Sequence, residues 1–106
     1  MPYIKQEQRD LLDKEIDAFI KKVKELHQSD NSITRDGLLN YSFTRIIHHV
    51  YDKNKYHELN EAMGMIECMK HELYRTRIGP YEDEKILENG NVDMPESLKK
   101  STKDQY

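Results

Sequence analysis

Apolar residues recur at spacings of three and four along most of the chain, which is the period of an amphipathic α-helix. The pattern predicts one helix over about 7–28, a second over about 35–52 and a third over about 57–78. The predicted apolar stripes comprise Leu12, Ile16, Phe19, Val23 and Leu26; Leu39, Phe43, Ile46, Ile47 and Val50; and Leu59, Ala62, Met63, Ile66, Met69 and Leu73. Each stripe is expected to form part of a shared core.

Polar breaks separate these helices. The segment SDNSIT (29–34) is rich in residues that bond their own backbone, and Thr34 is the expected N-cap of the second helix. A short polar turn over 52–56 favours an antiparallel helix hairpin. The pair Gly79-Pro80 predicts a helix stop, with Gly79 in the left-handed conformation and Pro80 opening a short fourth helix that ends at Asn89-Gly90.

The predicted fold class is therefore all-α: a small antiparallel bundle of three main helices plus a short C-terminal fourth helix and a polar tail. We expect a single helical domain over 1–92 and a polar, flexible tail over 93–106, because the chain beyond Val92 is rich in Lys and Ser.

Composition adds an expectation about assembly and location. Hydrophobic residues make up 36% of the 106 residues, with no Trp and two Phe, which is a lean inventory for a small domain. A lean core is often supplemented by association, so we expect a homo-oligomer. The single cysteine, Cys68, fits a reducing compartment, and neither a membrane-length apolar run nor a hydrophobic signal region is present. These features predict a cytoplasmic protein that does not bind membranes.

The formal net charge is −3, which argues against general nucleic-acid binding. Local clusters are more informative. Tyr41, Arg45 and His48 fall on the face of the second helix opposite its apolar stripe, with Thr44 beside them. In the third helix, Lys70 and Arg77 project from the centre of the stripe. Gly64 lies in mid-helix, where a glycine costs about 1 kcal/mol relative to alanine. A close helix approach or space left for a ligand would explain its presence; otherwise the glycine is simply tolerated.

The segment 67–83 has the densest mix of aromatic, cationic and acidic side chains, and three interpretations of it remain open. In the first, Arg75 and Arg77 pair with Glu82, with Asp83 or with helix carbonyls, and the cluster is structural. In the second, guanidinium groups bind an anion while tyrosine rings stack on a base. The ligand-binding residues would then be Tyr41, Arg45, Lys70, Tyr74, Arg75, Arg77 and Tyr81.

The third interpretation is a divalent-metal site formed by Glu67, His71, Glu72, Glu82 and Asp83. Its spacing is a poor fit, because adjacent helical residues such as His71 and Glu72 point about 100° apart. No nucleophile motif, glycine-rich phosphate loop or zinc spacing is present in the sequence. We therefore expect no catalytic residues, no metal and no cofactor.

Three blocks resemble the signature of a small helical protein family found in phage and bacterial genomes: LNYSFTRII (39–47), ECMKHELYRTR (67–77) and PYEDEKILENGNV (80–92). The starting sequence MPYIK is also similar. The resemblance implies motif positions at Asn40, Tyr41, Thr44, Arg45, Glu67, Glu72, Tyr74, Arg75, Tyr81, Glu82, Asp83 and Lys85. Thr76 stands where the family usually has a second arginine, and His71 matches no motif position, which weakens the metal interpretation.

These observations predict a non-enzymatic, oligomeric binding protein that recognises an anionic, nucleotide-like ligand or a protein partner. Ligand contacts are expected from the seven residues above, and a structural polar network is expected from Asn40, Thr44, Glu67, Glu72, Glu82, Asp83 and Lys85. The resemblance to phage proteins suggests counter-defence by sequestering a nucleotide signal. The alternative is a divalent-metal-dependent enzyme acting on a phosphate ester or nucleotide.

Overall fold

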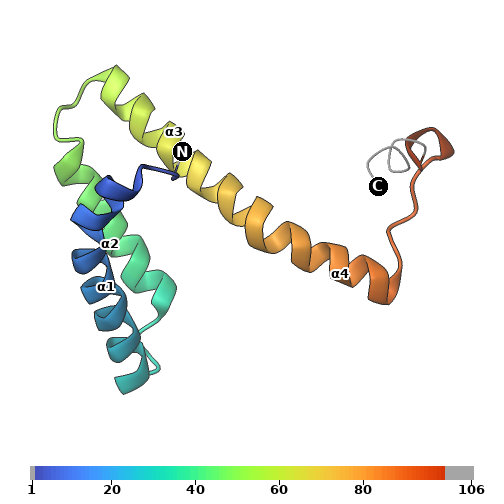
Figure 1. Ribbon diagram of the computed structural model, residues 1–106, viewed down its shortest axis with the longest axis horizontal. Helices are drawn as coiled ribbons and strands as arrows, with labels where there is room; N and C mark the ends of the chain where they lie inside the picture. Colours follow the sequence, from blue (N-terminus) through green and yellow to red (C-terminus); the bar gives the residue numbers. More distant parts are fainter. Residues whose placement is uncertain (1, 100–106) are drawn as a thin grey trace. The chain divides into compact units, whose positions relative to one another are not determined.

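The computed structural model describes residues 2–99 of the chain, and these residues are helical without a strand. The elements are α1 (Gln6–Ser29), α2 (Arg35–Val50), α3 (Tyr56–Leu73), a π-helical segment η1 (Tyr74–Ile78) and α4 (Gly79–Asn89) (Figure 1). The predicted all-α class, with three long helices and a shorter fourth, is confirmed. The chain divides into two compact units, Met1–Met69 and the chain from Lys70 onward.

In the first unit, α1 and α2 run antiparallel as a hairpin (Figure 1). Their apolar stripes face each other, and the rings of Phe19 and Phe43 pack in a tilted arrangement with centroids 6.4 Å apart. Val23, on the same stripe of α1, is buried at 9% exposure. This aromatic and aliphatic contact fixes the two helices against each other.

The loop between α1 and α2 is held by its own side chains. Ser32 donates from its backbone N–H and its hydroxyl to the Asp30 carboxylate, at 2.9 and 2.7 Å. Thr34 caps α2 as predicted, because its Oγ1 accepts from the Gly37 N–H at 3.1 Å. His27 Nδ1 donates to the Ile33 carbonyl at 2.7 Å, which ties the end of α1 to this loop.

Two contacts within the first unit involve the start of α3 and the N-terminal lead-in. The side chain of Glu58 accepts a hydrogen bond from the Lys53 N–H at 3.0 Å, across the turn that precedes α3. The N-terminal lead-in lies against α3, where Pro2, Met65, Cys68 and Met69 line a small hollow.

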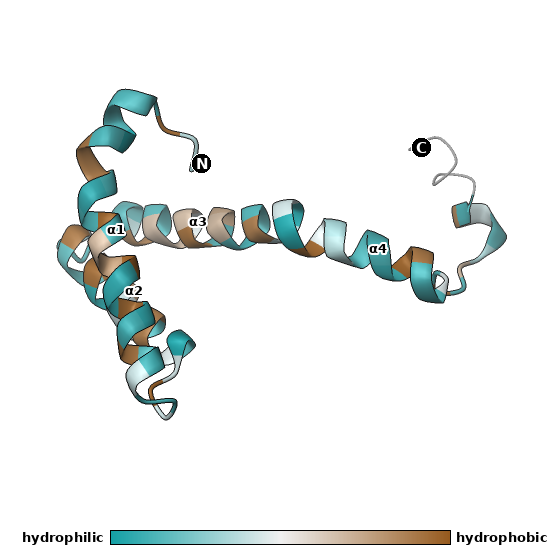
Figure 2. Cartoon of the chain, turned by 60° about the horizontal axis from the view of Figure 1, so that its bottom comes forward, coloured by the Kyte–Doolittle hydropathy of each residue, from teal (hydrophilic) through white to brown (hydrophobic). Residues whose placement is uncertain are grey.

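Most apolar side chains that were expected to form a core are uncovered. Among the described residues only Val23 and Ala62 are buried. Apolar positions recur along each helix (Figure 2), as the periodicity predicts, but the side chains at them remain largely in contact with solvent. The prediction of which face is apolar is right. The expectation that the chain itself covers that face is wrong for the described residues.

Gly64 also differs from its prediction. A Cβ built at this position meets nothing within 4 Å, so no close helix approach within the chain requires a glycine there.

In the second unit, Gly79-Pro80 does not stop the helix. Gly79 has φ −54 and ψ −54, a right-handed helical conformation, so the predicted left-handed stop is wrong. Its N–H bonds to the carbonyl of Tyr74, five residues earlier, and this defines the π-helical segment. In a regular α-helix the ring of Pro80 would clash with the carbonyl of Thr76, and the wider π-helical turn relieves that clash. A proline ring also crowds the Cβ of the residue before it, and Gly79 has no Cβ.

The π-helical turn changes the angle between successive residues. Arg77 lies within it, so its predicted place at the centre of the apolar stripe of α3 does not hold, and its side chain is exposed, as is that of Lys70. Pro80 occupies the first turn of α4, and that helix ends as predicted at Asn89-Gly90. Gly90 has φ +84 and donates its N–H to the Ile86 carbonyl at 2.8 Å. A helical turn follows over 96–99, and residues 100–106 of the expected tail lie outside the described residues.

Candidate functional site

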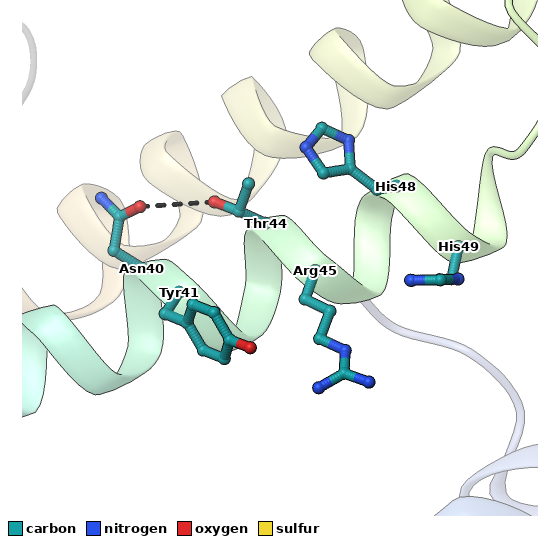
Figure 3. Close-up of a pocket in the computed structure, with 6 residues that line it drawn as sticks. All are labelled: Asn40, Tyr41, Thr44, Arg45, His48 and His49. Atoms are coloured by element: carbon teal, nitrogen blue, oxygen red, sulfur yellow. Dashed lines mark hydrogen bonds between the residues drawn. The ribbon is translucent and has the colours of Figure 1, made fainter.

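The polar face of α2 forms a shallow hollow of about 430 Å³ (Figure 3). Its lining residues come in pairs from three successive turns of the helix: Asn40, Tyr41, Thr44, Arg45, His48 and His49. The sequence predicted that Tyr41, Arg45 and His48 share a face with Thr44, and the structure brings these four together. This face is opposite the apolar stripe that meets α1.

Within the hollow, the Thr44 hydroxyl donates to the Asn40 side-chain oxygen at 3.3 Å. The bond joins two residues expected in a polar network and leaves the Asn40 amide NH₂ to donate outward. Tyr41 is 65% exposed, which is high for an aromatic ring. In Figure 3 the Tyr41 ring and the Arg45 guanidinium extend from the same side of the helix, with His48 at the other edge. A flat ring and a planar cation are thus presented side by side.

The chemistry of this face suits an anion with an aromatic part. Arg45 offers a planar fork of N–H donors, and histidine, asparagine and threonine add further donors. Among the described residues that line the hollow there is no carboxylate to compete with an anion. Tyr41 offers a surface on which a base can stack.

His48 and His49 are absent from the residues predicted to contact the ligand. A helical projection places His48 beside Tyr41 and Arg45, so the signal for its membership was present in the sequence.

The other predicted ligand residues lie in the second unit: Lys70, Tyr74, Arg75, Arg77 and Tyr81. All five side chains are exposed. The seven predicted residues are therefore divided, with Tyr41 and Arg45 in the first unit and the remainder in the second.

Arg75 forms an ion pair with Glu72, one helical turn earlier. The sequence predicts Glu82, Asp83 or helix carbonyls as partners of Arg75; the structure adds Glu72 as an ion-pair partner. Its origin is local, because residues three apart lie on one helix face. A guanidinium already held by a carboxylate is less available to a phosphate than the Arg45 side chain in a hollow without acids.

Tyr81 and Lys85 also interact locally. The Lys85 ammonium lies 5.5 Å from the centroid of the Tyr81 ring, and Lys85 bonds Glu88 at 3.1 Å. Glu82 and Asp83 follow Pro80 in the first turn of α4, where carboxylates are favoured by the helix dipole. These contacts support a structural role for the start of α4.

The described residues contain no group of three His, Cys, Asp or Glu side chains placed to hold a metal ion. The set proposed for the metal interpretation is divided between the two units, with Glu67 in the first and His71, Glu72, Glu82 and Asp83 in the second.

Two carboxyl groups near the start of α2 have perturbed acidity. Hydrogen bonds from the Ser32 side chain and backbone lower the pKa of Asp30. A hydrogen bond from the Thr34 side chain, assisted by backbone N–H groups, lowers the pKa of Asp36. Both effects stabilise the ionised form and belong to the loop and cap that set the start of α2.

The chain is thus a small all-α protein with a polar, cation-bearing face on α2. It belongs to the family described as a domain of unknown function (DUF6899), whose family model matches residues 1–92. Searches of curated proteins and of solved structures gave no match. In residues 2–99 no helix combines the length and apolar character needed to cross a bilayer.

Proposed function

We propose that this chain is a non-enzymatic binding protein that recognises an anionic, nucleotide-like ligand on the polar face of α2. The observation that supports the proposal is the hollow at Tyr41 and Arg45, which combines a stacking surface with a guanidinium and lacks a lining carboxylate. Binding without turnover would allow a phage-encoded cytoplasmic protein to sequester a nucleotide signal that the host uses in defence.

Calorimetric titration with mono-, di- and cyclic nucleotides, without added metal, tests this proposal. Binding should weaken about tenfold or more in Arg45→Ala, because a hydrogen bond to a charged group contributes about 1.5–3 kcal/mol. Arg75→Ala is the matched control: it removes the same type of side chain from the second unit, where Glu72 already pairs with it. Binding should change little in that variant.

Two results would contradict the proposal. Loss of binding in Arg75→Ala with retention in Arg45→Ala would move the ligand to the second unit. Turnover of a nucleotide or phosphate ester that requires magnesium or manganese and vanishes in Glu67→Gln would restore the metal-dependent enzyme.

A second candidate, binding of a protein partner, is favoured by a different observation. The apolar stripes of the first unit line two open grooves, about 670 Å³ between α1 and α2 and about 450 Å³ between α2 and α3. Uncovered apolar surface of this kind marks interaction sites in soluble proteins. The homo-oligomer expected from the lean composition would use such a surface.

A further inference from the structure

The groove between α2 and α3 has the size and lining of a site for a small molecule. Its volume is about 450 Å³, and six of its eight lining residues are apolar: Phe43, Ile46, Ile47, Met65, Ile66 and Met69. Small-molecule sites typically measure about 300–1,000 Å³ and are mostly apolar, with a few polar groups that fix the orientation of the ligand. The two polar residues of this groove are Asn40 and Thr44.

These two polar residues form a rim that the groove shares with the polar hollow of α2. Asn40 and Thr44 line both the groove and the hollow. At about 100° per residue around the helix, they lie between Ile47 on the groove side and Tyr41 on the hollow side. Their mutual hydrogen bond of 3.3 Å joins side chains one turn apart along the rim (Figure 3). The groove and the hollow are therefore adjoining parts of one surface.

The polarity of this surface changes at the rim. The hollow side carries the Arg45 guanidinium, two histidines and the outward-facing amide of Asn40. Among the described residues, none that lines the groove is charged. An anionic group is stabilised by donors such as those of the hollow, whereas a hydrocarbon chain needs only apolar contact. A molecule that combines the two is complementary to both sides of the rim.

The α3 wall of the groove suits a flexible chain. Met65 and Met69 have unbranched side chains that adapt to irregular shapes. Both also line the small hollow at Pro2, so apolar surface continues from the groove toward the N-terminal lead-in. The groove between α1 and α2 differs from this one, because it shares no lining residue with the polar hollow.

We infer that the ligand of the α2 face is an amphiphilic anion, a nucleotide whose phosphate carries an apolar chain that lies in the α2–α3 groove. The inference rests on the proposed function, since the polar hollow holds the nucleotide part. The base stacks on Tyr41, and the phosphate lies at the rim, where Arg45 and the Asn40 amide donate to it. The chain crosses the rim beside Thr44 and packs on the α3 wall.

Two esters of adenosine monophosphate test the role of the chain. The methyl and octyl phosphoesters have the same base and the same phosphodiester charge, and they differ only in the length of the alkyl chain. In calorimetric titration of the full chain, the octyl ester should bind about tenfold or more tightly than the methyl ester, because its added methylene groups leave water for the groove.

Two matched variants locate the chain. Ile66→Gln places a polar amide in the α2–α3 groove and should reduce the gain from the octyl group to about threefold or less, with little effect on the methyl ester. Retained binding of the methyl ester would show that this variant folds. Ile20→Gln is the control, because Ile20 is 45% exposed, against 40% for Ile66, and lines the α1–α2 groove instead. The full gain should persist in it.

The outcomes separate the inference from the proposed function. Equal binding of the two esters would overturn the inference and retain the proposed function, whereas binding of neither ester would reject both. A gain that is lost in Ile20→Gln and kept in Ile66→Gln would move the chain to the other groove and overturn the inference. Equal binding of the esters together with weaker self-association of Ile66→Gln in analytical ultracentrifugation would assign the α2–α3 groove to a second copy of the chain.

Discussion

The backbone N–H of Gly79 bonds to the carbonyl oxygen of Tyr74, and a Cβ at position 79 would lie 3.3 Å from that same oxygen. This contact is tighter than ordinary van der Waals distance, and the carbonyl is held in the π-helical turn by the bond itself. Glycine at position 79 therefore avoids a close contact with the Tyr74 carbonyl in the π-helical turn, and this turn accommodates Pro80 within the helix.

Gly79→Ala is therefore expected to gain none of the roughly 1 kcal/mol by which alanine normally exceeds glycine in a helix. Gly64→Ala is the matched control, because an added Cβ there meets nothing within 4 Å. That variant should be more stable by about 0.5–1 kcal/mol. Urea unfolding followed by circular dichroism measures both. An equal gain in the two variants would show that the Tyr74 carbonyl moves aside without cost.

The cap of α2 gives a second prediction. Thr34→Ala removes the acceptor of the Gly37 N–H and should lower the free energy of unfolding by about 1 kcal/mol. Thr34→Ser keeps the hydroxyl and should lose little. If both variants lose the same amount, the methyl group of Thr34 and not its hydroxyl supports the loop.

Acid should destabilise the loop before α2. The pKa of Asp36 is lowered first by the hydrogen bond from Thr34, and the pKa of Asp30 by that from Ser32. A lowered folded-state pKa contributes stability above the unfolded value of about 3.9, and this contribution is lost as pH falls through the folded value.

Asp36→Asn should accordingly reduce the difference in stability between pH 7 and pH 3, measured as a shift in the urea midpoint. Asp93→Asn is the control, because that residue lies far along the chain from the cap. An unchanged pH difference in Asp36→Asn would contradict the role given to Thr34.

Ala62 is one of the two buried apolar residues of the described chain, at 5% exposure. Ala62→Leu adds three carbons where little space is left and should cost about 1–3 kcal/mol. Met63→Leu changes an exposed neighbour and should be nearly neutral. Comparable unfolding midpoints for the two variants would show that α3 is not packed at Ala62.

Much of the fold could be predicted from the sequence because helical periodicity is a local property. The bounds of α1 and α2, the Thr34 cap and the end of α4 at Asn89-Gly90 all follow from residues within a few positions of each other. The single domain over 1–92 stays a prediction. Periodicity shows which face of a helix is apolar, but it does not show what covers that face. This is why the stripes were expected to form a core within one chain.

The π-helical segment could not be predicted by the same reasoning. Helical projections assume 100° per residue, and one π turn shifts every later side chain. The pair Gly79-Pro80 is also compatible with two structures, a helix end and a π-helical turn. Which one forms depends on the backbone hydrogen bond from Gly79 to Tyr74, a residue outside the pair. The face of α2 was predictable because its helix is regular, although the ligand contacts assigned to it remain proposals.

The central claim, that a nucleotide-like anion binds the face of α2, is tested most directly by mapping backbone amide chemical shifts during a nucleotide titration. The account predicts that the largest changes cluster at residues 40–49, around Tyr41 and Arg45, and that they disappear in Arg45→Ala. Changes centred on residues 74–81, or saturating changes in neither segment across the nucleotide panel, would contradict it.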